Sequence, residues 1–429
     1  MKKLLLIVAA VLITSATSGH SANNLYVVNG LAETVSKINL DNGVVSNHII
    51  NTGLVPNDIK IEGDKAYILN STSDDIHILN LATDTVIDTI AFSRYENPWE
   101  IYIDGDLAYV TNWLSGNLYE VDLKEGMILR AFAVGSTIEG VFRHGDRLFV
   151  TDVNFDFDNY TYGDGILYYA NLPDLDEWQS LNVGINPQRI IGGPDGNLHI
   201  ICSGNYADVF GAIYIVDPIN VTIVDSINIG GSPGYAAVNG SGKVFVGAGG
   251  WGDHGEVYCY DGTTYAVLND PSNPIITDPG ASGITADLDG NVYCCNSMPG
   301  VGTVSKIDAQ RQVVDSYNVG DGASVAALYN TETGIEGDTV PFQPEIGLSA
   351  YPNPFNDKTT IIFKLPDAGE IELAIHNLNG QRLTVLEDGF RRGGKHSVNW
   401  DAAGFSSGVY FYQLKAGDKV ISKRMTLLK

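Results

Sequence analysis

Three features of the 429-residue sequence predict an all-β protein with two domains. Glycine is abundant, with 48 residues, and supplies the positive-φ positions that tight turns between short strands need. A short β-rich segment recurs seven times between residues 26 and 296. From residue 347 onward the repeat is absent, and short segments of alternating apolar and polar residues follow. We therefore expect a seven-bladed β-propeller followed by a small immunoglobulin-like β-sandwich.

The first 22 residues have the organisation of a secretory signal peptide. Lys2 and Lys3 precede an unbroken apolar run over residues 4–13, and small residues follow up to Ala22, where we expect cleavage. The run is too short for a permanent membrane anchor, and no later stretch approaches the roughly twenty apolar residues that a span needs. We expect a secreted mature chain without a transmembrane segment.

The repeats predict the architecture of residues 23–330. The repeated segments are 26–29 (YVVN), 67–70 (YILN), 109–112 (YVTN), 149–152 (FVTD), 199–202 (HIIC), 245–248 (FVGA) and 293–296 (YCCN). Six of them follow a turn signal: Gly63-Asp64, Gly105-Asp106, Gly145-Asp146, Asp195-Gly196, Ser241-Gly242 and Asp289-Gly290. A short apolar strand precedes each turn and two alternating strands follow each segment. Each unit of 40 to 50 residues therefore predicts four strands, which make one propeller blade.

The two ends of the repeat region complement each other. The first unit has no strand before residue 26, and an extra strand, residues 324–329, follows the last unit. We expect this C-terminal strand to complete the blade that residues 25–50 begin. Closing the ring in this way removes an exposed sheet edge, on which other chains could pair.

The four cysteines do not form a disulfide framework. Cys202, Cys259, Cys294 and Cys295 lie in predicted strands of a chain of more than 400 residues. We interpret them as small buried apolar side chains, and leave a bridge from Cys259 to a neighbouring strand as the alternative. No two of them have the spacing of a zinc or c-type haem site.

Residues 25–330 resemble a known family of propellers. The YVTN segment at residues 109–112, the period near 40 residues and the preceding turns with proline are similar to the YVTN family of bacterial seven-bladed propellers. This resemblance implies the fold but no single function, since the family includes surface-layer proteins, DNA-associated propellers and lyases. Blades three to six have longer loops, which can carry a specificity of their own.

The C-terminal part is predicted to be a separate domain. Residues 331–346 are acidic and rich in Thr, Gly and Pro, as is typical of a linker, and residues 347–429 contain alternating strands that suit a small sandwich. Its motifs are YPNPFN (351–356), NGQ (379–381), SGVYFY (407–412) and KRMTLLK (423–429).

These motifs resemble the type A C-terminal sorting domain of type IX secretion. The resemblance implies the secretion machinery as a partner, passage across the outer membrane, removal of the domain and, often, attachment to surface lipopolysaccharide. We leave an adhesive or spacer sandwich of the same fold as the alternative.

Charge differs between the two regions. Residues 23–344 hold 42 of the 51 acidic residues but only 12 of the 25 basic ones, a net charge of −30. Phosphate backbones would be repelled by such a surface, so nucleic acid is not expected as a partner. The acidic surface favours solubility outside the cell and attracts cations.

One mouth of the central channel is the expected ligand site. The loops that enter the innermost strands converge there. Aromatic and charged residues that could stack a sugar ring or hold a peptide are Trp99, Glu100, Trp113, Glu139, Arg189, Tyr235 and Trp251. The alternative for Trp99 and Trp113 is packing between blades. We expect an extracellular glycan, peptide or protein as the ligand.

Four aspartates in one long loop region form a candidate metal site. Asp152, Asp156, Asp158 and Asp164 would repel one another unless a hard cation such as Ca²⁺ gathered them. Their spacing does not match an EF-hand loop, and a solvated acidic loop is the alternative. Ca²⁺ is the only cofactor that the sequence suggests.

A second cluster is the candidate catalytic group. Asp253, His254 and Glu256 are the only histidine and two carboxylates that lie together on an expected mouth loop. A turn built from glycines is the alternative, and other enzyme signatures are missing, including a nucleophile elbow and a phosphate-binding loop. The sequence therefore favours a secreted, surface-attached propeller that binds or displays a ligand. A propeller lyase or hydrolase and a structural surface-layer component are the alternatives.

Overall fold

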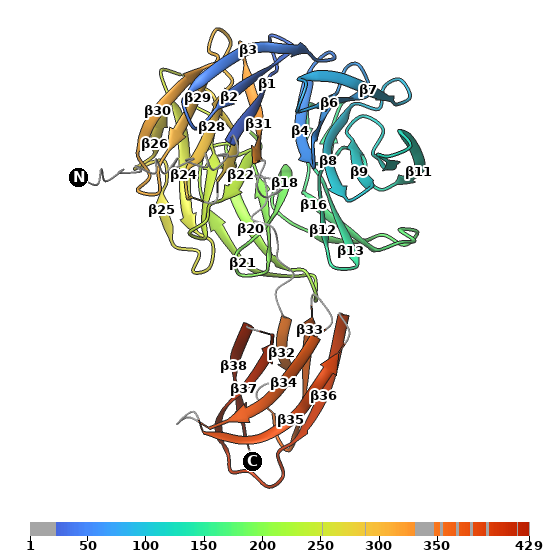
Figure 1. Ribbon diagram of the computed structural model, residues 1–429, viewed down its shortest axis with the longest axis vertical. Helices are drawn as coiled ribbons and strands as arrows, with labels where there is room; N and C mark the ends of the chain where they lie inside the picture. Colours follow the sequence, from blue (N-terminus) through green and yellow to red (C-terminus); the bar gives the residue numbers. More distant parts are fainter. Residues whose placement is uncertain are drawn as a thin grey trace, which may run out of the picture. The chain divides into compact units, whose positions relative to one another are not determined.

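The computed structural model describes residues 23–428, apart from 251, 288, 331–346, 352–354, 366–368, 378–380, 392–393 and 418. The predicted signal peptide and linker lie outside these described residues. The described elements are all β-strands, and the chain divides into two compact units, Met1–Val340 and Pro341–Lys429 (Figure 1). Within this described part, no helix is long and apolar enough to cross a membrane.

The first unit consists of antiparallel sheets, which we number as blades in chain order. Each blade is given from its innermost to its outermost strand. Blade 1 contains β31 (Ala323–Asn330), β1 (Asn23–Asn29), β2 (Thr34–Asn39) and β3 (Val44–Asn51). Blade 2 contains β4 (Pro56–Glu62), β5 (Lys65–Asn70), β6 (Asp75–Asn80) and β7 (Thr85–Ala91). Blade 3 contains β8 (Pro98–Asp104), β9 (Leu107–Asn112), β10 (Asn117–Asp122) and β11 (Met127–Ala133).

Of the remaining blades, blades 4 and 6 carry additions to the four-strand pattern. Blade 4 contains β12 (Ile138–His144), β13 (Arg147–Asp152), β16 (Ile166–Asn171) and β17 (Gln179–Asn182), with a small hairpin of β14 (Phe155–Asp156) and β15 (Thr161–Tyr162) inserted. Blade 5 contains β18 (Pro187–Gly192), β19 (Leu198–Cys202), β20 (Ala212–Asp217) and β21 (Thr222–Asn228). Blade 6 contains β22 (Tyr235–Val238), β23 (Lys243–Gly247), β24 (Gly255–Asp261), β25 (Val267–Asn269) and β26 (Ile275–Thr277), which pairs with β24. Blade 7 contains β27 (Ala281–Ala286), β28 (Val292–Asn296), β29 (Thr303–Ile307) and β30 (Val313–Asn318).

The innermost strands form a closed ring. Each contacts the innermost strand of the next blade, from β4 through β8, β12, β18 and β22 to β27, and β31 contacts both β27 and β4. Strand β31 pairs antiparallel with β1, with Leu25 opposite Leu328 and Val27 opposite Ala326. The prediction that the extra C-terminal strand completes the first blade is therefore confirmed. The all-β class, a propeller followed by a sandwich, is confirmed as well.

The repeated segments occupy the second strand of each blade, between two neighbours of the same sheet. These strands are almost completely buried; in β5, for example, every residue after the first is buried. The outermost strands, such as β7, are mostly exposed. At the turns before the second strands, all six predicted glycines have positive φ, for example 59° at Gly63 and 65° at Gly105. This conformation is easy only for glycine, which explains why the turn signal accompanies the repeat. The four cysteines are buried and unbridged.

Hydroxyl side chains form hydrogen bonds between neighbouring blades at several positions. Ser71 donates to the carbonyl of Pro98 at 2.7 Å, and Thr111 donates to the carbonyl of Glu139. Ser282 donates to the carbonyl of Ser324 at 3.2 Å, across the seam where the ring closes. These bonds fix the innermost strands at the mouth of the channel, where the candidate site lies.

Blades 5 and 6 are joined by a buried polar cluster. The ring of His199 bonds to the Tyr260 hydroxyl at 2.8 Å through Nδ1 and to the Asp195 carboxylate at 3.1 Å through Nε2. Tyr265 and Asn197 donate to the same carboxylate, at 2.5 and 2.6 Å. Burial alone would raise the pKa of Asp195, but the hydrogen bonds from His199, Tyr265 and Asn197 outweigh it and lower the pKa to about 2.

The second unit is a sandwich of two antiparallel sheets. One sheet contains β32 (Gly347–Tyr351), β33 (Lys358–Leu365) and β36 (Gly394–Asp401). The other contains β35 (Arg382–Arg391), β34 (Gly369–His376), β37 (Gly408–Ala416) and β38 (Lys419–Leu427). Trp400 lies in the core, with its ring 5.5 Å from that of Phe355 and 5.4 Å from that of Tyr410. Two of the sequence motifs, around Phe355 and Tyr410, thus supply the core.

Ring closure can be tested by placing a charge in β31. Val325 is 3% exposed and packs in the core cluster of blades 1 and 2, whereas Val314 on the outermost strand β30 is 54% exposed. We expect Val325→Asp to lower the free energy of unfolding by at least about 3 kcal/mol, because it buries an unpaired charge. Val314→Asp is the matched control and should have little effect. Equal effects in urea denaturation would contradict the packing of β31 in the ring.

The Asp195 cluster predicts a defined pH dependence. A carboxylate with a lowered pKa stabilises the folded state above its unfolded pKa, near 4, and loses this contribution as the pH falls through about 2. We expect Asp195→Asn to lower the free energy of unfolding at neutral pH by about 2 kcal/mol. The difference from the unmodified protein should shrink below pH ~4. A difference that stays constant down to pH ~2 would contradict this assignment.

Candidate functional site at the channel mouth

Strand register brings the predicted mouth residues together. Pro98 at the start of β8 pairs with Asn112 at the end of β9, and Ile138 pairs with Asp152 in the same way in blade 4. The starts of the innermost strands and the ends of the second strands therefore lie at one end of each blade. A Cβ at Gly140 would lie 3.0 Å from the carbonyl oxygen of Gln188 and 3.1 Å from Cα of Arg189. Glycine at this position thus allows β12 and β18 to approach closely.

Arg189 is the centre of a buried charge cluster. Its Nη1 lies 2.5 Å from Glu100 Oε1, and its Nη2 lies 3.6 Å from Asp58 Oδ1. Its guanidinium carbon lies 3.9 Å from the centre of the Tyr235 ring, which places a cation over an aromatic face. The structure therefore joins three predicted mouth residues, Glu100, Arg189 and Tyr235, and adds Asp58.

The electrostatics of this cluster follow from burial and pairing. Burial lowers the pKa of Arg189, but Glu100, Tyr235 and Asp58 together raise it well above the ordinary value, so the guanidinium stays charged. Burial raises the pKa of Glu100, while Arg189 and the backbone N–H of Val141, which donates to Glu100 at 3.1 Å, oppose that rise. The cluster thus holds two carboxylates that share one guanidinium, and Lys60 also acts on Glu100.

Glu139 is a further buried carboxylate at the mouth, and within the described part of the chain it forms no ion pair of the kind that Arg189 makes with Glu100 and Asp58. It is 3% exposed, and its Oε2 has no hydrogen-bond partner in the protein. Burial raises its pKa to about 8, although Arg189 and Trp113 lower it. Trp113 is close enough to influence the Glu139 carboxyl, but its indole Nε1 makes no hydrogen bond of standard geometry. A buried carboxyl with such a pKa is largely protonated at neutral pH.

Aromatic side chains from three blades gather beside Glu139. The rings of Trp99 and Trp113 are stacked with centres 5.9 Å apart. The contacts continue along the loops of blades 4 and 5, and we call this group the aromatic cluster: Trp99, Trp113, Phe155, Phe157, Tyr160, Tyr162 and Tyr206. Phe157, Tyr160 and Tyr206 are exposed by 46%, 79% and 56%. Trp99 and Trp113 stack on each other and are partly buried, so both the packing and the binding interpretation apply to them.

Part of the cluster escaped sequence reasoning. Phe157, Tyr160 and Tyr162 lie in the loop between β13 and β16, which was interpreted only through its aspartates. Tyr206 lies in the loop between β19 and β20, and Gln188 donates to its hydroxyl at 3.1 Å. The density of aromatic residues in these two long loops is the signal that could have identified them.

A cavity continues down the channel below the charged residues. Its volume is ≈ 80 Å³, and Lys60, Glu100, Arg189 and Tyr235 line one part of it. Apolar side chains such as Ile101 and Val325 line much of the rest. Sites for drug-sized ligands measure roughly 300–1,000 Å³, so this cavity suits a few water molecules better than a sugar. The ligand is therefore expected above it, at the mouth.

The four aspartates of the predicted calcium site do not converge. The Asp152 carboxylate is buried and accepts hydrogen bonds from the backbone N–H groups of Ser136 and Thr137, at 2.7 and 3.1 Å. Asp156 accepts from the backbone N–H of Asp158 at 2.8 Å, within its own turn, and Asp164 is exposed. In the described part of the chain no three His, Cys, Asp or Glu side chains form a group that could hold a metal ion. The Ca²⁺ site stays a prediction, and this geometry adds no support for it.

Two of the three predicted catalytic residues lie together. His254 Nε2 is 3.6 Å from Glu256 Oε1, and Glu256 Oε2 accepts a hydrogen bond from the Tyr258 hydroxyl at 2.5 Å. Asp253 is exposed, and neither of these interactions includes it. Trp251, the remaining predicted mouth residue, lies outside the described residues. A catalytic role for this loop stays a prediction.

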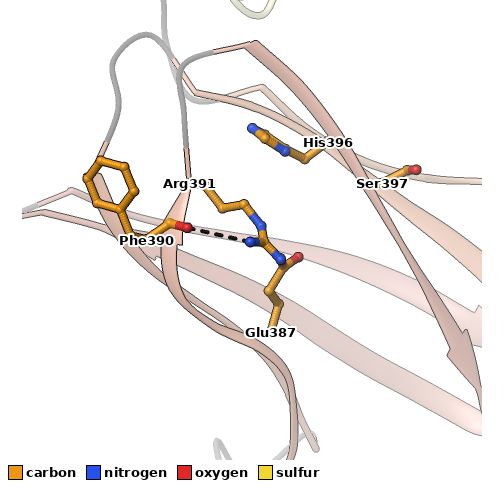
Figure 2. A pocket seen from close by; sticks show the side chains of 5 residues that line it. All are labelled: Glu387, Phe390, Arg391, His396 and Ser397. Atoms are coloured by element: carbon orange, nitrogen blue, oxygen red, sulfur yellow. Dashed lines mark hydrogen bonds and ion pairs between the residues drawn. The ribbon is translucent and has the colours of Figure 1, made fainter.

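The sandwich has a separate open pocket of ≈ 640 Å³. Figure 2 shows its lining, Glu387, Phe390 and Arg391 of β35 with His396 and Ser397 of β36. Arg391 forms an ion pair with Glu387 and donates to the carbonyl of Phe390 at 3.4 Å. Because these charged groups pair with each other, we assign no ligand to this pocket.

The C-terminal unit matches a known family. Residues 349–427 match the secretion system C-terminal sorting domain. This match indicates export and attachment at the cell surface, with the secretion machinery as a partner. The resemblance to a type IX sorting domain is thereby confirmed.

The propeller is similar in fold to several solved structures. Hydrazine synthase of Kuenenia stuttgartiensis aligns with a TM-score of 0.52 at 15% identity, over 66% of this chain and 94% of that one. A functionally unknown protein from Desulfotomaculum acetoxidans aligns with a TM-score of 0.55 at 14% identity, over 72% and 99%. The β-propeller domain of Cps50 (Swd1) from Myceliophteria thermophila aligns with a TM-score of 0.47 at 14% identity, over 68% and 98%. No curated protein sequence matches this chain significantly. At such identities the likeness concerns the fold and not the activity.

The Arg189 cluster predicts a large effect of one substitution. Arg189→Met removes the cation that forms ion pairs with Glu100 and Asp58 and should cost about 3–5 kcal/mol of unfolding free energy. Lys37→Met is the matched control, because the Lys37–Asp84 pair is partly exposed and should contribute about 1 kcal/mol or less. Urea denaturation measures both. Similar losses for the two variants would contradict the central role of Arg189.

Proposed function

We propose that this chain is a surface-attached binding protein, a seven-bladed propeller of the YVTN type that takes an extracellular ligand at the channel mouth. The observation that carries this proposal is the aromatic cluster at the same end of the blades as the buried charges, in which Phe157, Tyr160 and Tyr206 are exposed. Exposed aromatic side chains that touch one another are uncommon on a soluble surface and favour ligand or partner contact. A sugar ring or an extended peptide are the ligands that such rings can hold.

The two units have complementary roles in this proposal. The sorting domain carries the propeller to the cell surface, and the propeller presents the mouth to the extracellular medium. Long loops in blades 4 and 5 supply most of the exposed rings, while the short turns of blade 2 supply none of the cluster. Specificity would therefore reside in a few loops on a rigid ring, as is usual for binding sites on repeat folds.

Binding is better supported than catalysis by the arrangement of side chains. A lyase or hydrolase needs an acid and a base that converge on a substrate. His254, in the loop before β24, faces Glu256 in that strand, and both side chains lie partly in solvent. A structural surface-layer role remains the third possibility, and it would show as assembly of the purified protein without a ligand.

Array binding with matched variants tests the proposal. We expect the purified full chain to bind glycans or peptides on an array, and Phe157→Ala to weaken that binding about tenfold or more, because stacked aromatic contacts contribute on the order of 1 kcal/mol or more each. Phe390→Ala in the sandwich is the control, since Phe390 is similarly exposed, by 60%. Equal losses for the two variants, or no binding together with ligand-free assembly, would overturn the proposal.

A further inference from the structure

Several buried polar atoms at the mouth make no hydrogen bond of standard geometry within the described part of the protein. They include Glu139 Oε2, Trp113 Nε1 and both amide atoms of the Asn186 side chain. Asn186 is completely buried and has a positive φ of 57°, a conformation that is uncommon outside glycine. Most buried polar groups in folded proteins are hydrogen-bonded, so a local group of exceptions points to a ligand or to ordered water.

These residues lie at the same end of blades 3, 4 and 5, where Pro98 pairs with Asn112, Ile138 with Asp152 and Pro187 with Cys202. Trp113 acts on the pKa of Glu139, and the Glu139 charge acts on the pKa values of Tyr162 and Tyr206, which agrees with this common location. Asn186 is close enough to Tyr206 to affect the pKa of its hydroxyl. The rings of Tyr162 and Tyr206 are 5.8 Å apart. We call Trp113, Glu139, Tyr162, Asn186 and Tyr206 the mouth site.

The protein already holds one cation with the same combination of groups. The Arg189 guanidinium lies between the carboxylates of Glu100 and Asp58 and over the ring of Tyr235. The mouth site repeats the carboxylate and the aromatic rings, but Arg189 is engaged with the neighbouring cluster. The mouth site therefore has the groups that bind a cation, while Arg189, which also acts on Glu139, forms its ion pairs with Glu100 and Asp58.

The groups present favour an organic cation over a metal ion. Calcium takes about six to eight oxygen ligands, and the mouth site offers one carboxyl, one amide oxygen and tyrosine hydroxyls. Aromatic faces attract ammonium groups, and a nearby carboxylate adds a direct charge interaction. The net charge of −30 on residues 23–344 would raise the local concentration of such a ligand.

We propose that the mouth site binds the ammonium group of its ligand, with the Glu139 carboxylate as counter-ion and the rings of Trp113, Tyr162 and Tyr206 as walls. This inference rests on the proposed function and names the chemistry of the ligand. A neutral glycan or a neutral peptide is the competing outcome. Binding of the cation restores the ionised form of Glu139, which the buried free site disfavours.

Choline and its neutral isostere 3,3-dimethylbutan-1-ol test this charge requirement. They have nearly the same shape, so calorimetric titration of the purified full chain separates charge from apolar contact. We expect choline to bind about tenfold or more tightly than the isostere, and Glu139→Gln to abolish this preference. Asp156→Asn, an exposed carboxylate on the loop that carries the rings, is the matched control and should keep the preference.

A pH series keeps the test valid should Glu139→Gln fail to fold. Choline affinity should rise as the pH increases through about 8, because Glu139 then loses its proton. The other ionisable groups that act on Glu139 are Arg189, Glu100, Asp152, Tyr162 and Tyr206. The two tyrosines have raised pKa values and stay neutral over this range, and Arg189 stays charged. Burial raises the pKa of Glu100 to about 7, so the change assigned to Glu139 is the one that continues above that pH. An affinity that does not change with pH would overturn the inference.

The remaining outcomes separate this inference from the proposed function. Two outcomes would overturn the ammonium site and leave the proposed function intact. One is equal affinity for choline and the isostere. The other is array binding to neutral ligands only, provided that Phe157→Ala abolishes this binding. No binding in any assay overturns both. Glucosamine against N-acetylglucosamine, and lysine amide against its Nε-acetyl form, then show whether a sugar or a peptide carries the ammonium group.

Discussion

The pairing of β31 with β1 determines the geometry of everything else in the propeller. It joins residues about 300 positions apart and converts a row of sheets into a ring, because β31 contacts the innermost strands on both sides of it. The innermost strands can then face a common axis without an open sheet edge. Only in a closed ring do side chains from blades 2, 3 and 5, such as Asp58, Glu100 and Arg189, come within contact distance. The Arg189 cluster is thus a consequence of closure.

Arg189 is the main counter-ion of the carboxylates at the channel, and Lys60 also acts on Glu100. Breaking such a buried ion-pair group is costly although the group itself need not add much stability. Arg189 lowers the pKa of Glu139, but burial outweighs this effect and raises the pKa to about 8, so the carboxyl is largely neutral at neutral pH. A protein that only needed a stable ring would gain from an apolar residue here. The carboxyl and the aromatic rings near it are the groups on which the proposed ligand site depends.

The sorting domain and the propeller bury their apolar residues in different ways. The propeller buries its apolar strands by stacking repeated sheets, so its loops can vary while the ring stays rigid. The sandwich buries one compact core around Trp400, and its sequence motifs combine core residues, such as Phe355 and Tyr410, with turns. This division explains why the sandwich is recognised by sequence over residues 349–427, whereas the propeller is similar to other proteins mainly in fold.

The sequence by itself determined the β-class, the number of repeat units, the closing strand and the sorting domain, because these depend on local periodicity and on turn chemistry that each segment carries alone. It also singled out Glu100, Arg189 and Tyr235 by their positions at the entry of the innermost strands. The tertiary structure alone decided which side chains meet. In the tertiary structure the four aspartates do not converge, because the Asp152 carboxylate accepts hydrogen bonds from the backbone N–H groups of Ser136 and Thr137. Tyr162 and Tyr206 come from two different loops and are both close enough to Glu139 for its charge to act on them. Contacts between blades depend on loop paths and on the angle between sheets, and neither is written in the spacing of residues along one strand.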